Sequence, residues 1–156
     1  MNSPQQITIK PIGYVKTDAE GDEVKDKTRT STIIIDPELL PALDGIEDYS
    51  HLHILFWMHE ISEKDRIKMK VHPRGRTDLP LVGAFAVRTN HRPNPVGLTI
   101  VELLDVDKNI LTVRGLDAFN GTPVLDIKPY DNWDIMTDPR VPKWWQKLEQ
   151  EKMQKP

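Results

Sequence analysis

HLHILFWMHE, residues 51–60, is the strongest apolar run in the chain and the stretch that decides the fold. Its length and aromatic content are typical of a buried β-strand. Alternation along a strand places two sets of side chains on opposite faces: His51, His53, Leu55, Trp57 and His59 on one, and Leu52, Ile54, Phe56, Met58 and Glu60 on the other. Three histidines on one face suggest a metal site, but Leu55 and Trp57 separate His53 from His59, and the other two are too few ligands. We therefore expect no metal.

Further short strands are predicted on both sides of this run. They are residues 7–16 (bent at Pro11 and Gly13), 31–35, 67–71 as an edge strand, 83–87 (GAFAV), two strands within 98–119 joined by a hairpin at DVDKN, and 122–130. Asp36 and Pro37 begin one short helix that Pro41 keeps short, and residues 142–154 form a helical tail. The pattern is mainly β, with six to eight strands.

Composition sets the class of protein. The chain has 156 residues, 38% hydrophobic and 29% charged, with a net charge of −3 and no cysteine. It has no apolar run of membrane-spanning length and no signal-peptide core, so we expect a globular cytoplasmic protein without a membrane partner. We place the β domain at residues 1–135 and the helical tail at 136–156.

Residues 82–97, VGAFAVRTNHRPNPVG, form a second notable stretch. Pro93 and Pro95 stiffen the backbone that carries Arg88, His91 and Arg92. Residues 66–92 contain seven lysines and arginines but only one acid, Asp78, and this local positive charge favours a phosphate-rich partner. The alternative is a proline-rich turn beside an edge strand whose lysines are simply solvated.

The loop at residues 116–120 lies between two predicted strands, just before the strong turn signal Asn120-Gly121. Its acid, aromatic ring and amide could hold an adenine or a ribose, whereas a plain hairpin turn is the alternative. The chain carries no dinucleotide-binding glycine motif, Walker A loop, GxSxG or HExxH.

Several of these stretches together resemble the TrmO family. They are IGYVKT, LDGIEDYSHLHILFWMHE, VHPRGRTDLPLVGAFAVRTNHRPNPVGLTIVELL and GLDAFNGTPVLDIKPY, and they cover roughly residues 9–132. Members of this family are S-adenosylmethionine-dependent methyltransferases that act on N6 of threonylcarbamoyladenosine at position 37 of tRNA. The resemblance implies a single-sheet β-barrel that forms a homodimer. It also implies cofactor contacts, for S-adenosyl-L-methionine, at His59, Glu60, Arg88, Ile100, Asp117, Ala118, Phe119 and Asn120.

By the same resemblance the anticodon stem-loop would meet Arg74, Arg76, His91 and Arg92. A hydrogen-bond acceptor near N6 would help catalysis, and the candidates are Asp117, Asn94 and Asp126. Two departures concern the cofactor site: Asn120 stands where the family usually has Asp, and Arg29 is the nearest candidate for a family contact in the first loop. Two other functions stay open, namely methylation of a small molecule and a non-catalytic RNA-binding barrel.

Overall fold

The computed structural model describes residues 5–155, which divide into two compact units. The first is formed by residues up to Ile61 together with Pro95–Asp131, and the second by Ser62–Asn94 together with the chain from Asn132 on. The domain boundary expected after residue 135 falls inside the second unit. Each unit is formed by two separate segments of the chain.

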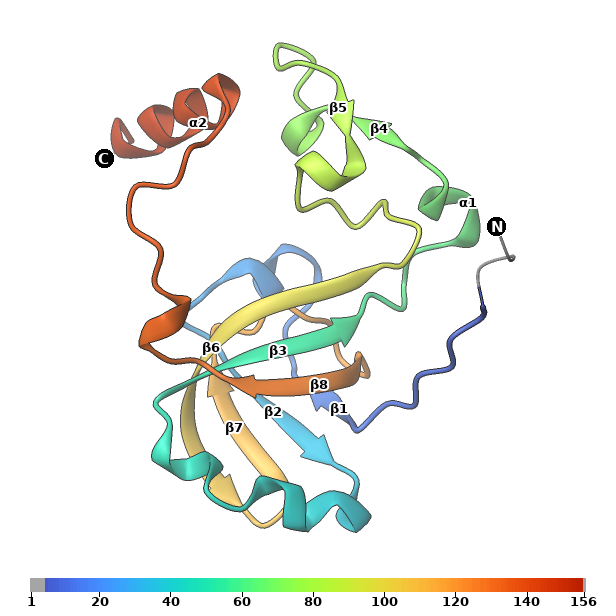
Figure 1. The fold of residues 1–156 in the computed structure, drawn as a ribbon, viewed down its shortest axis with the longest axis vertical. Coiled ribbons are helices and arrows are strands. Elements are labelled where there is room, and N and C mark those ends of the chain that lie inside the picture. The colour runs from blue at the N-terminus through green and yellow to red at the C-terminus, as the bar shows by residue number, and fades with distance from the viewer. Residues whose placement is uncertain (1–4, 156) are drawn as a thin grey trace. The chain divides into compact units, whose positions relative to one another are not determined.

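The first unit is a closed antiparallel barrel of six strands, as expected from the sequence (Figure 1). The strands are β1 (Gly13–Lys16), β2 (Thr30–Ile35), β3 (His51–Trp57), β6 (Val96–Asp107), β7 (Ile110–Arg114) and β8 (Pro123–Pro129). Around the barrel they follow the order β1-β2-β7-β6-β3-β8, and pairing of β1 with β8 closes it. Closure leaves no sheet edge exposed in this unit.

Alternating side chains of β3 fill the barrel, which confirms the period-two prediction. Leu52, Ile54 and Phe56 are buried, whereas their neighbours on β3 are partly exposed. They pack with apolar side chains from the other strands, among them Ile33 and Leu111. Burial of a contiguous apolar cluster is the main stabilising contribution to such a domain.

Gly97 of β6 lies opposite Phe56 of β3 in the sheet register. A Cβ atom at Gly97 would lie 2.3 Å from two carbon atoms of the Phe56 ring. The glycine therefore leaves the space in which this ring packs.

Two predicted strands are corrected here. Residues 7–12 are not in a strand, and the first strand begins only at Gly13. Of GAFAV, only Gly83 is in a strand, the two-residue β5 (Val82–Gly83), and Ala84–Ala86 form a 3₁₀ turn, η5. In this turn Ala84 is buried but Phe85 is 80% exposed. The apolar run is therefore not buried on both sides, as a central strand would be.

The expected short helix is a 3₁₀ helix, η2 (Pro37–Leu43), with Asp36 accepting a hydrogen bond from the Glu38 amide as its N-cap. Pro41 lies inside η2 and cannot donate the amide hydrogen bond that an α-helix requires. Two further 3₁₀ helices belong to the barrel unit: η1 (Gly21–Lys25) and η3 (Ile46–Asp48).

The second unit holds the remaining elements. They are α1 (Glu63–Arg66), β4 (Lys70–Val71), η4 (Pro73–Gly75), β5, η5, η6 (Asn132–Asp134) and α2 (Lys143–Met153). β4 and β5 pair antiparallel, so the predicted edge strand at 67–71 exists only as its last two residues. In α2, which confirms the predicted tail helix, Leu148 is buried and Trp145 is 41% exposed.

No helix among residues 5–155 is long and apolar enough to cross a membrane. Within the same described residues, no three His, Cys, Asp or Glu side chains gather closely enough to hold a metal ion. His51 and His53, on the outer face of β3, pack against the ring of Tyr130. The strand predicted over residues 51–60 ends at Trp57, so His59 lies beyond it in the chain.

Candidate functional site

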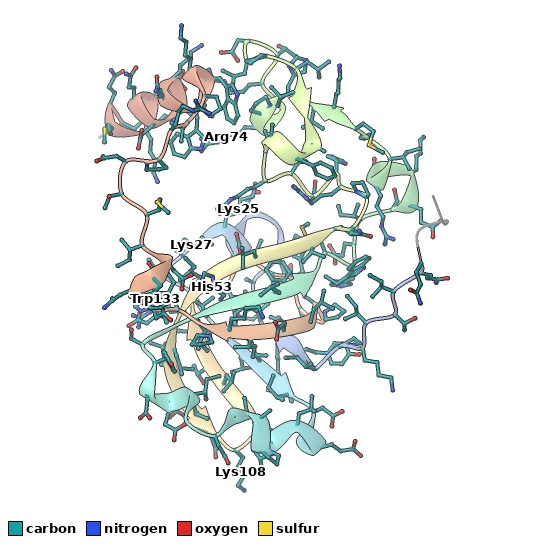
Figure 2. The ribbon with its side chains drawn as sticks, viewed as in Figure 1. Lys25, Lys27, His53, Arg74, Lys108 and Trp133 are labelled. Carbon is teal, nitrogen blue, oxygen red and sulfur yellow. The ribbon has the colours of Figure 1, made fainter. Side chains whose placement is uncertain are left out.

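The strand register brings three connections to one end of the barrel. The first two residues of β1, Gly13 and Tyr14, pair with the start of β8, so the end of β1 lies beside the loop that precedes β8, where the Val15 amide donates to the Thr122 carbonyl. The start of β2 pairs with the end of β7. The end of β3 likewise pairs with the start of β6, as Trp57 opposite Val96 shows. Residues 17–29, the chain that follows Trp57, and residues 115–122 therefore all leave the barrel at this end. In Figure 2, Lys25 and Lys27 lie at this end and Lys108, in the β6–β7 hairpin, at the opposite one.

The loop at residues 115–122 is fixed to the barrel by its backbone. The amide of Gly115 donates to the Arg29 carbonyl at 3.0 Å, and the amide of Gly121 donates to the Val15 carbonyl at 2.8 Å. Both glycines have positive φ, +88° and +78°, a conformation that other residues rarely adopt. The predicted Asn-Gly turn is thus part of a wider, anchored loop.

Burial alternates along this loop and sorts its side chains. Leu116 and Ala118 are 4% and 3% exposed, so they point into the barrel. Asp117, Phe119 and Asn120 are exposed to solvent. The side chains that could meet a ligand are therefore the acid, the ring and the amide.

Asp117 is held at both carboxylate oxygens. Oδ1 accepts a hydrogen bond from the hydroxyl of Thr99 on β6, and Oδ2 lies 3.1 Å from Lys27 Nζ. The same ammonium donates to the Gly115 carbonyl at 3.1 Å. A carboxylate held in this way is an acceptor of fixed orientation, exposed over 38% of its side-chain surface.

Two of the predicted cofactor residues, His59 and Asn120, connect this loop to neighbouring segments. Thr122 Oγ1 lies 3.4 Å from His59 Nδ1, within hydrogen-bonding distance, and connects the chain after β3 to the end of the loop. Asn120 Oδ1 accepts a hydrogen bond from the Thr17 amide at 3.2 Å, which connects the first loop to it. The structure thus brings together His59, Asp117, Ala118, Phe119 and Asn120, as one group on the barrel unit.

The three other predicted cofactor residues lie on other segments, and among residues 5–155 none of them forms a hydrogen bond or ion pair with this loop. Ile100 lies on β6 opposite His53 of β3, and its side chain is 48% exposed on the outside of the barrel. Glu60 is exposed just beyond β3, and Arg88 is exposed in the second unit. The roles given to these three remain predictions.

The three predicted catalytic candidates differ in their surroundings. Asp126 lies on β8, where its carboxylate is 2.8 Å from Lys128 Nζ. Asn94 is an exposed residue of the second unit. Of the three, Asp117 alone belongs to the loop at 115–122.

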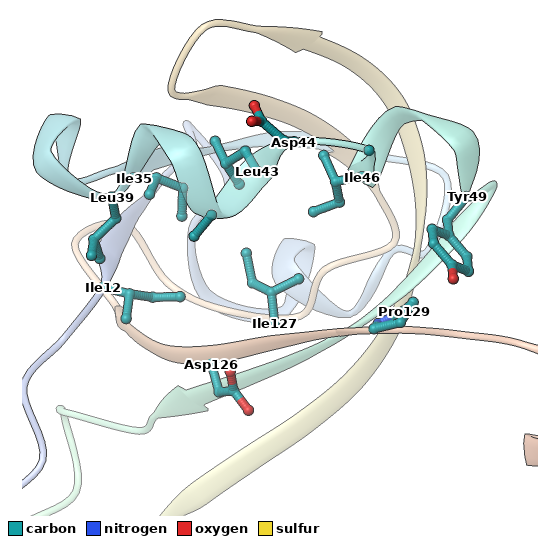
Figure 3. Close-up of a pocket in the computed structure, with 12 residues that line it drawn as sticks. Ile12, Ile35, Leu39, Leu43, Asp44, Ile46, Tyr49, Asp126, Ile127 and Pro129 are labelled. Carbon is teal, nitrogen blue, oxygen red and sulfur yellow. The ribbon is translucent and has the colours of Figure 1, made fainter.

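A cavity of about 380 Å³ lies in the barrel unit beneath η2 and η3 (Figure 3). Apolar side chains such as Ile35, Leu43 and Ile127 line it, and the Asp126 carboxylate points away from it. Because β2 ends and β8 ends at this side, the cavity is at the opposite end of the barrel from the loop at 115–122. It therefore contains none of the grouped cofactor candidates.

The predicted RNA-binding residues lie in the second unit, and three of them, Arg76, His91 and Arg92, have partners within it. Arg92 donates from Nη1 to the carbonyls of Val87 and Thr89, both at 2.9 Å, and its guanidinium is 5.9 Å from the Phe85 ring centre. His91 Nδ1 lies 3.3 Å from the Asp65 carbonyl. Arg92 therefore holds the backbone of the loop that was predicted to be stiff because of Pro93 and Pro95.

Arg76 is paired with acids on two sides. It hydrogen bonds to both oxygens of Asp78, at 2.9 and 2.6 Å, and to Glu151 of α2, with a shortest distance of 2.5 Å. Lys147 of α2 also contacts Asp78, at 3.1 Å. These bonds hold the pKa of Arg76 above its usual value, chiefly through Asp78, and those of Asp78 and Glu151 below theirs, chiefly through Arg76.

Arg74 differs from Arg76. It is exposed, with a positive φ of 54° in η4 (Figure 2). Within residues 5–155 no ion pair is recorded for Arg74 or for Arg88. These two guanidinium groups are therefore the better candidates for phosphate contacts.

Sequence reasoning missed Lys27, Thr99 and Thr122, which complete the surroundings of Asp117 and His59. Lys27 lies in a polar loop without periodicity, and the two threonines lie within predicted strands. Only Thr122, one residue after the Asn-Gly turn, carries a local signal, because such turns fix the position of the residues that follow.

Comparison with known proteins places the chain in a family. The model of the tRNA-methyltransferase O N-terminal domain matches residues 19–134. A probable S-adenosyl-L-methionine-binding protein of Methanothermobacter thermautotrophicus is 43% identical over 134 residues, covering 82% of this chain and 93% of the relative. A putative S-adenosylmethionine-dependent methyltransferase of Pseudomonas aeruginosa, RcsF, is 41% identical, covering 66% of this chain and 47% of the relative.

Among solved structures, TrmO from Pseudomonas aeruginosa superposes with a TM-score of 0.71 at 29% identity. The match covers 89% of this chain but only 63% of the TrmO chain. This chain thus spans nearly the whole archaeal relative and less than two thirds of the solved TrmO protein. The match also confirms the barrel fold.

Proposed function

The chain belongs to the tRNA-methyltransferase O (TrmO) family, and we propose that it binds S-adenosyl-L-methionine and methylates N6 of threonylcarbamoyladenosine 37 in tRNA. The family and the relatives' names support the cofactor and the class of reaction. The observation that carries the proposal is the group of side chains around the loop at 115–122, with Asp117 held between Thr99 and Lys27. The choice of tRNA rests on the TrmO resemblance and on the exposed arginines of the second unit.

The residues present fit this cofactor. The Asp117 carboxylate suits a ligand that carries positive charge, and the exposed Phe119 ring offers a surface on which an adenine can stack. Asn120 uses its Oδ1 for the Thr17 amide, which leaves its NH₂ group to donate to a ligand. In the adjoining first loop, the buried Nε of Arg29 has no hydrogen-bond partner among the described residues, a polar atom that the protein alone leaves unsatisfied.

When bound, S-adenosylmethionine supplies a methyl group that becomes bonded to N6 as its bond to sulfur breaks. The role of the protein is then mainly to hold the base in line and to accept the proton that N6 gives up. Asp117 is the strongest of the three candidates for that acceptor. Asp126 is ion-paired with Lys128 outside the loop group, and the Asn94 amide cannot take up a proton near neutral pH.

We propose that the anticodon stem-loop binds through the second unit, with Arg74 and Arg88 contacting phosphates and the loop shaped by Arg92 presenting His91. We further propose a homodimer. Its support is the outer face of β6, where Leu98 and Ile100 are 52% and 48% exposed, an apolar surface that a second copy of the chain would cover.

The test uses the purified chain with S-adenosylmethionine and tRNA that contains threonylcarbamoyladenosine. Mass spectrometry of the digested nucleosides should show a product one methyl group heavier. Asp117→Asn should lower turnover about 10- to 100-fold, because a charge-assisted contact is lost, whereas the matched control Asp126→Asn should stay within about twofold.

Three outcomes would change the proposal. Calorimetric binding of the cofactor with no methylated tRNA would favour a small-molecule substrate. Binding of tRNA by a chain that does not bind S-adenosylmethionine would favour a non-catalytic RNA-binding barrel. Equal losses in Asp117→Asn and Asp126→Asn would remove the special role of Asp117.

A further inference from the structure

Lys27 occupies the place at Asp117 that a positively charged ligand would need. Its Nζ lies 3.1 Å from Asp117 Oδ2 and donates to the Gly115 carbonyl at 3.1 Å. Thr99 holds the other oxygen from inside the barrel, where its side chain is buried. The carboxylate therefore has one buried partner, Thr99, and one partner on the solvent side, Lys27.

The solvent-side partner is easily moved. The Lys27 side chain is 58% exposed and comes from the long loop between β1 and β2. Exposed ion pairs contribute little to stability, because water competes with them and a long side chain must be ordered. A cation brought by a ligand can thus replace the lysine at little cost.

We propose that Lys27 is a removable counter-ion of Asp117. In the ligand-free protein it neutralises the carboxylate and orients it together with Thr99. When the cofactor binds, a cationic group of the cofactor replaces the Lys27 ammonium at Oδ2, and the lysine moves into solvent. This inference rests on the proposed function, since it takes Asp117 to be the cofactor's carboxylate.

The test removes the competing charge. Lys27→Gln keeps a donor for the Gly115 carbonyl but carries no charge, so it should bind S-adenosylmethionine about two- to fivefold more tightly in calorimetry. Lys25→Gln is the matched control, because Lys25 lies in the same loop, pairs with Asp22 at 2.6 Å and has the same charge. The control should bind as the unchanged protein does.

Two further measurements isolate the charge exchange. In an Asp117→Asn background, Lys27→Gln should no longer alter affinity, because the carboxylate for which lysine and ligand compete is gone. S-adenosylhomocysteine lacks the sulfonium charge but keeps the ammonium, and 5′-methylthioadenosine lacks both. If Lys27→Gln tightens binding of S-adenosylmethionine and S-adenosylhomocysteine but not of 5′-methylthioadenosine, the ammonium is the group that replaces Lys27. If it tightens binding of S-adenosylmethionine alone, the sulfonium is that group.

Weaker or unchanged binding in Lys27→Gln would overturn the inference, as would an equal gain for all three ligands or for Lys25→Gln. A thermal melt of the ligand-free variant shows whether it is folded, so that weak binding is not mistaken for unfolding. Failure of the unchanged protein to bind S-adenosylmethionine would overturn the proposed function and this inference together. Normal binding without the expected gain would overturn this inference alone.

Discussion

Gly97→Ala tests whether the barrel depends on the contact between Gly97 and Phe56. The new Cβ would lie 2.3 Å from the Phe56 ring, and non-bonded carbon atoms prefer about 3.5 Å or more. The ring would have to move by roughly 1.2 Å within a close-packed core, where Phe56 is only 5% exposed. Overpacking of this kind costs about 1–3 kcal/mol, so we expect the free energy of unfolding to fall by that amount.

Urea denaturation followed by circular dichroism measures this change. The control is Gly83→Ala, where a Cβ would meet nothing within 4 Å and the backbone φ is −65°. That substitution should leave stability unchanged or raise it by up to about 1 kcal/mol, because alanine restricts the unfolded chain. The double variant Gly97→Ala with Phe56→Leu should lose less than the sum of the two single losses, because the smaller side chain leaves room for the methyl group. Equal stability of the Gly97→Ala and Gly83→Ala variants would refute the packing argument.

Two further predictions concern the second unit. Arg92→Ala should weaken tRNA binding or turnover while cofactor binding largely survives, because the two backbone carbonyls held by its guanidinium are released. Electrophoretic mobility shifts measure the binding of tRNA, and calorimetry measures the binding of the cofactor. Unchanged methylation of tRNA would contradict the role given to this loop. The ion pairs of Arg76 with Asp78 and with Glu151 of α2 should hold α2 against the segment that carries Arg76 at any pH above about 4, the ordinary pKa of a carboxyl group. This stabilisation should be lost as the pH falls through the lowered pKa values of the two acids. Limited proteolysis with pepsin between pH 2 and 5 should detect release of α2, and Arg76→Gln, which lacks the pairs at every pH, should show a weaker pH dependence; the same dependence in both proteins would count against the ion pairs.

The strands of the barrel were predictable because their signal is local. Alternation in residues 51–57 indicated which side chains of β3 are buried, and the DVDKN segment indicated the β6–β7 hairpin. GAFAV shows the limit of such reasoning. It is as apolar as a strand, yet Ala84–Ala86 turn, because a short run needs a neighbouring strand on which to remain extended, and β4 offers only two paired residues.

The candidate site was predictable in part. The sequence motifs pointed to the loop at 115–122 and to His59, but they did not indicate what holds Asp117. Thr99 is 18 residues before Asp117, and Lys27 precedes Asp117 by a still larger separation, so no periodicity or turn rule relates them. The pairing of Arg76 with Glu151, 75 residues apart, was equally hidden, and it changes a predicted phosphate contact into a group already paired with acids.

The sequence by itself determined the mainly β class, the buried face of β3, the position of the hairpin and the resemblance to one family, because these follow from local periodicity, turn chemistry and motifs. The tertiary structure decided which strands are neighbours, and therefore that the loops after β1, β3 and β7 meet at one end of the barrel. It also decided that Asp117 carries a buried partner on one oxygen and an exposed lysine on the other. Such contacts arise from strand register and packing between distant segments, which no local pattern in the chain specifies.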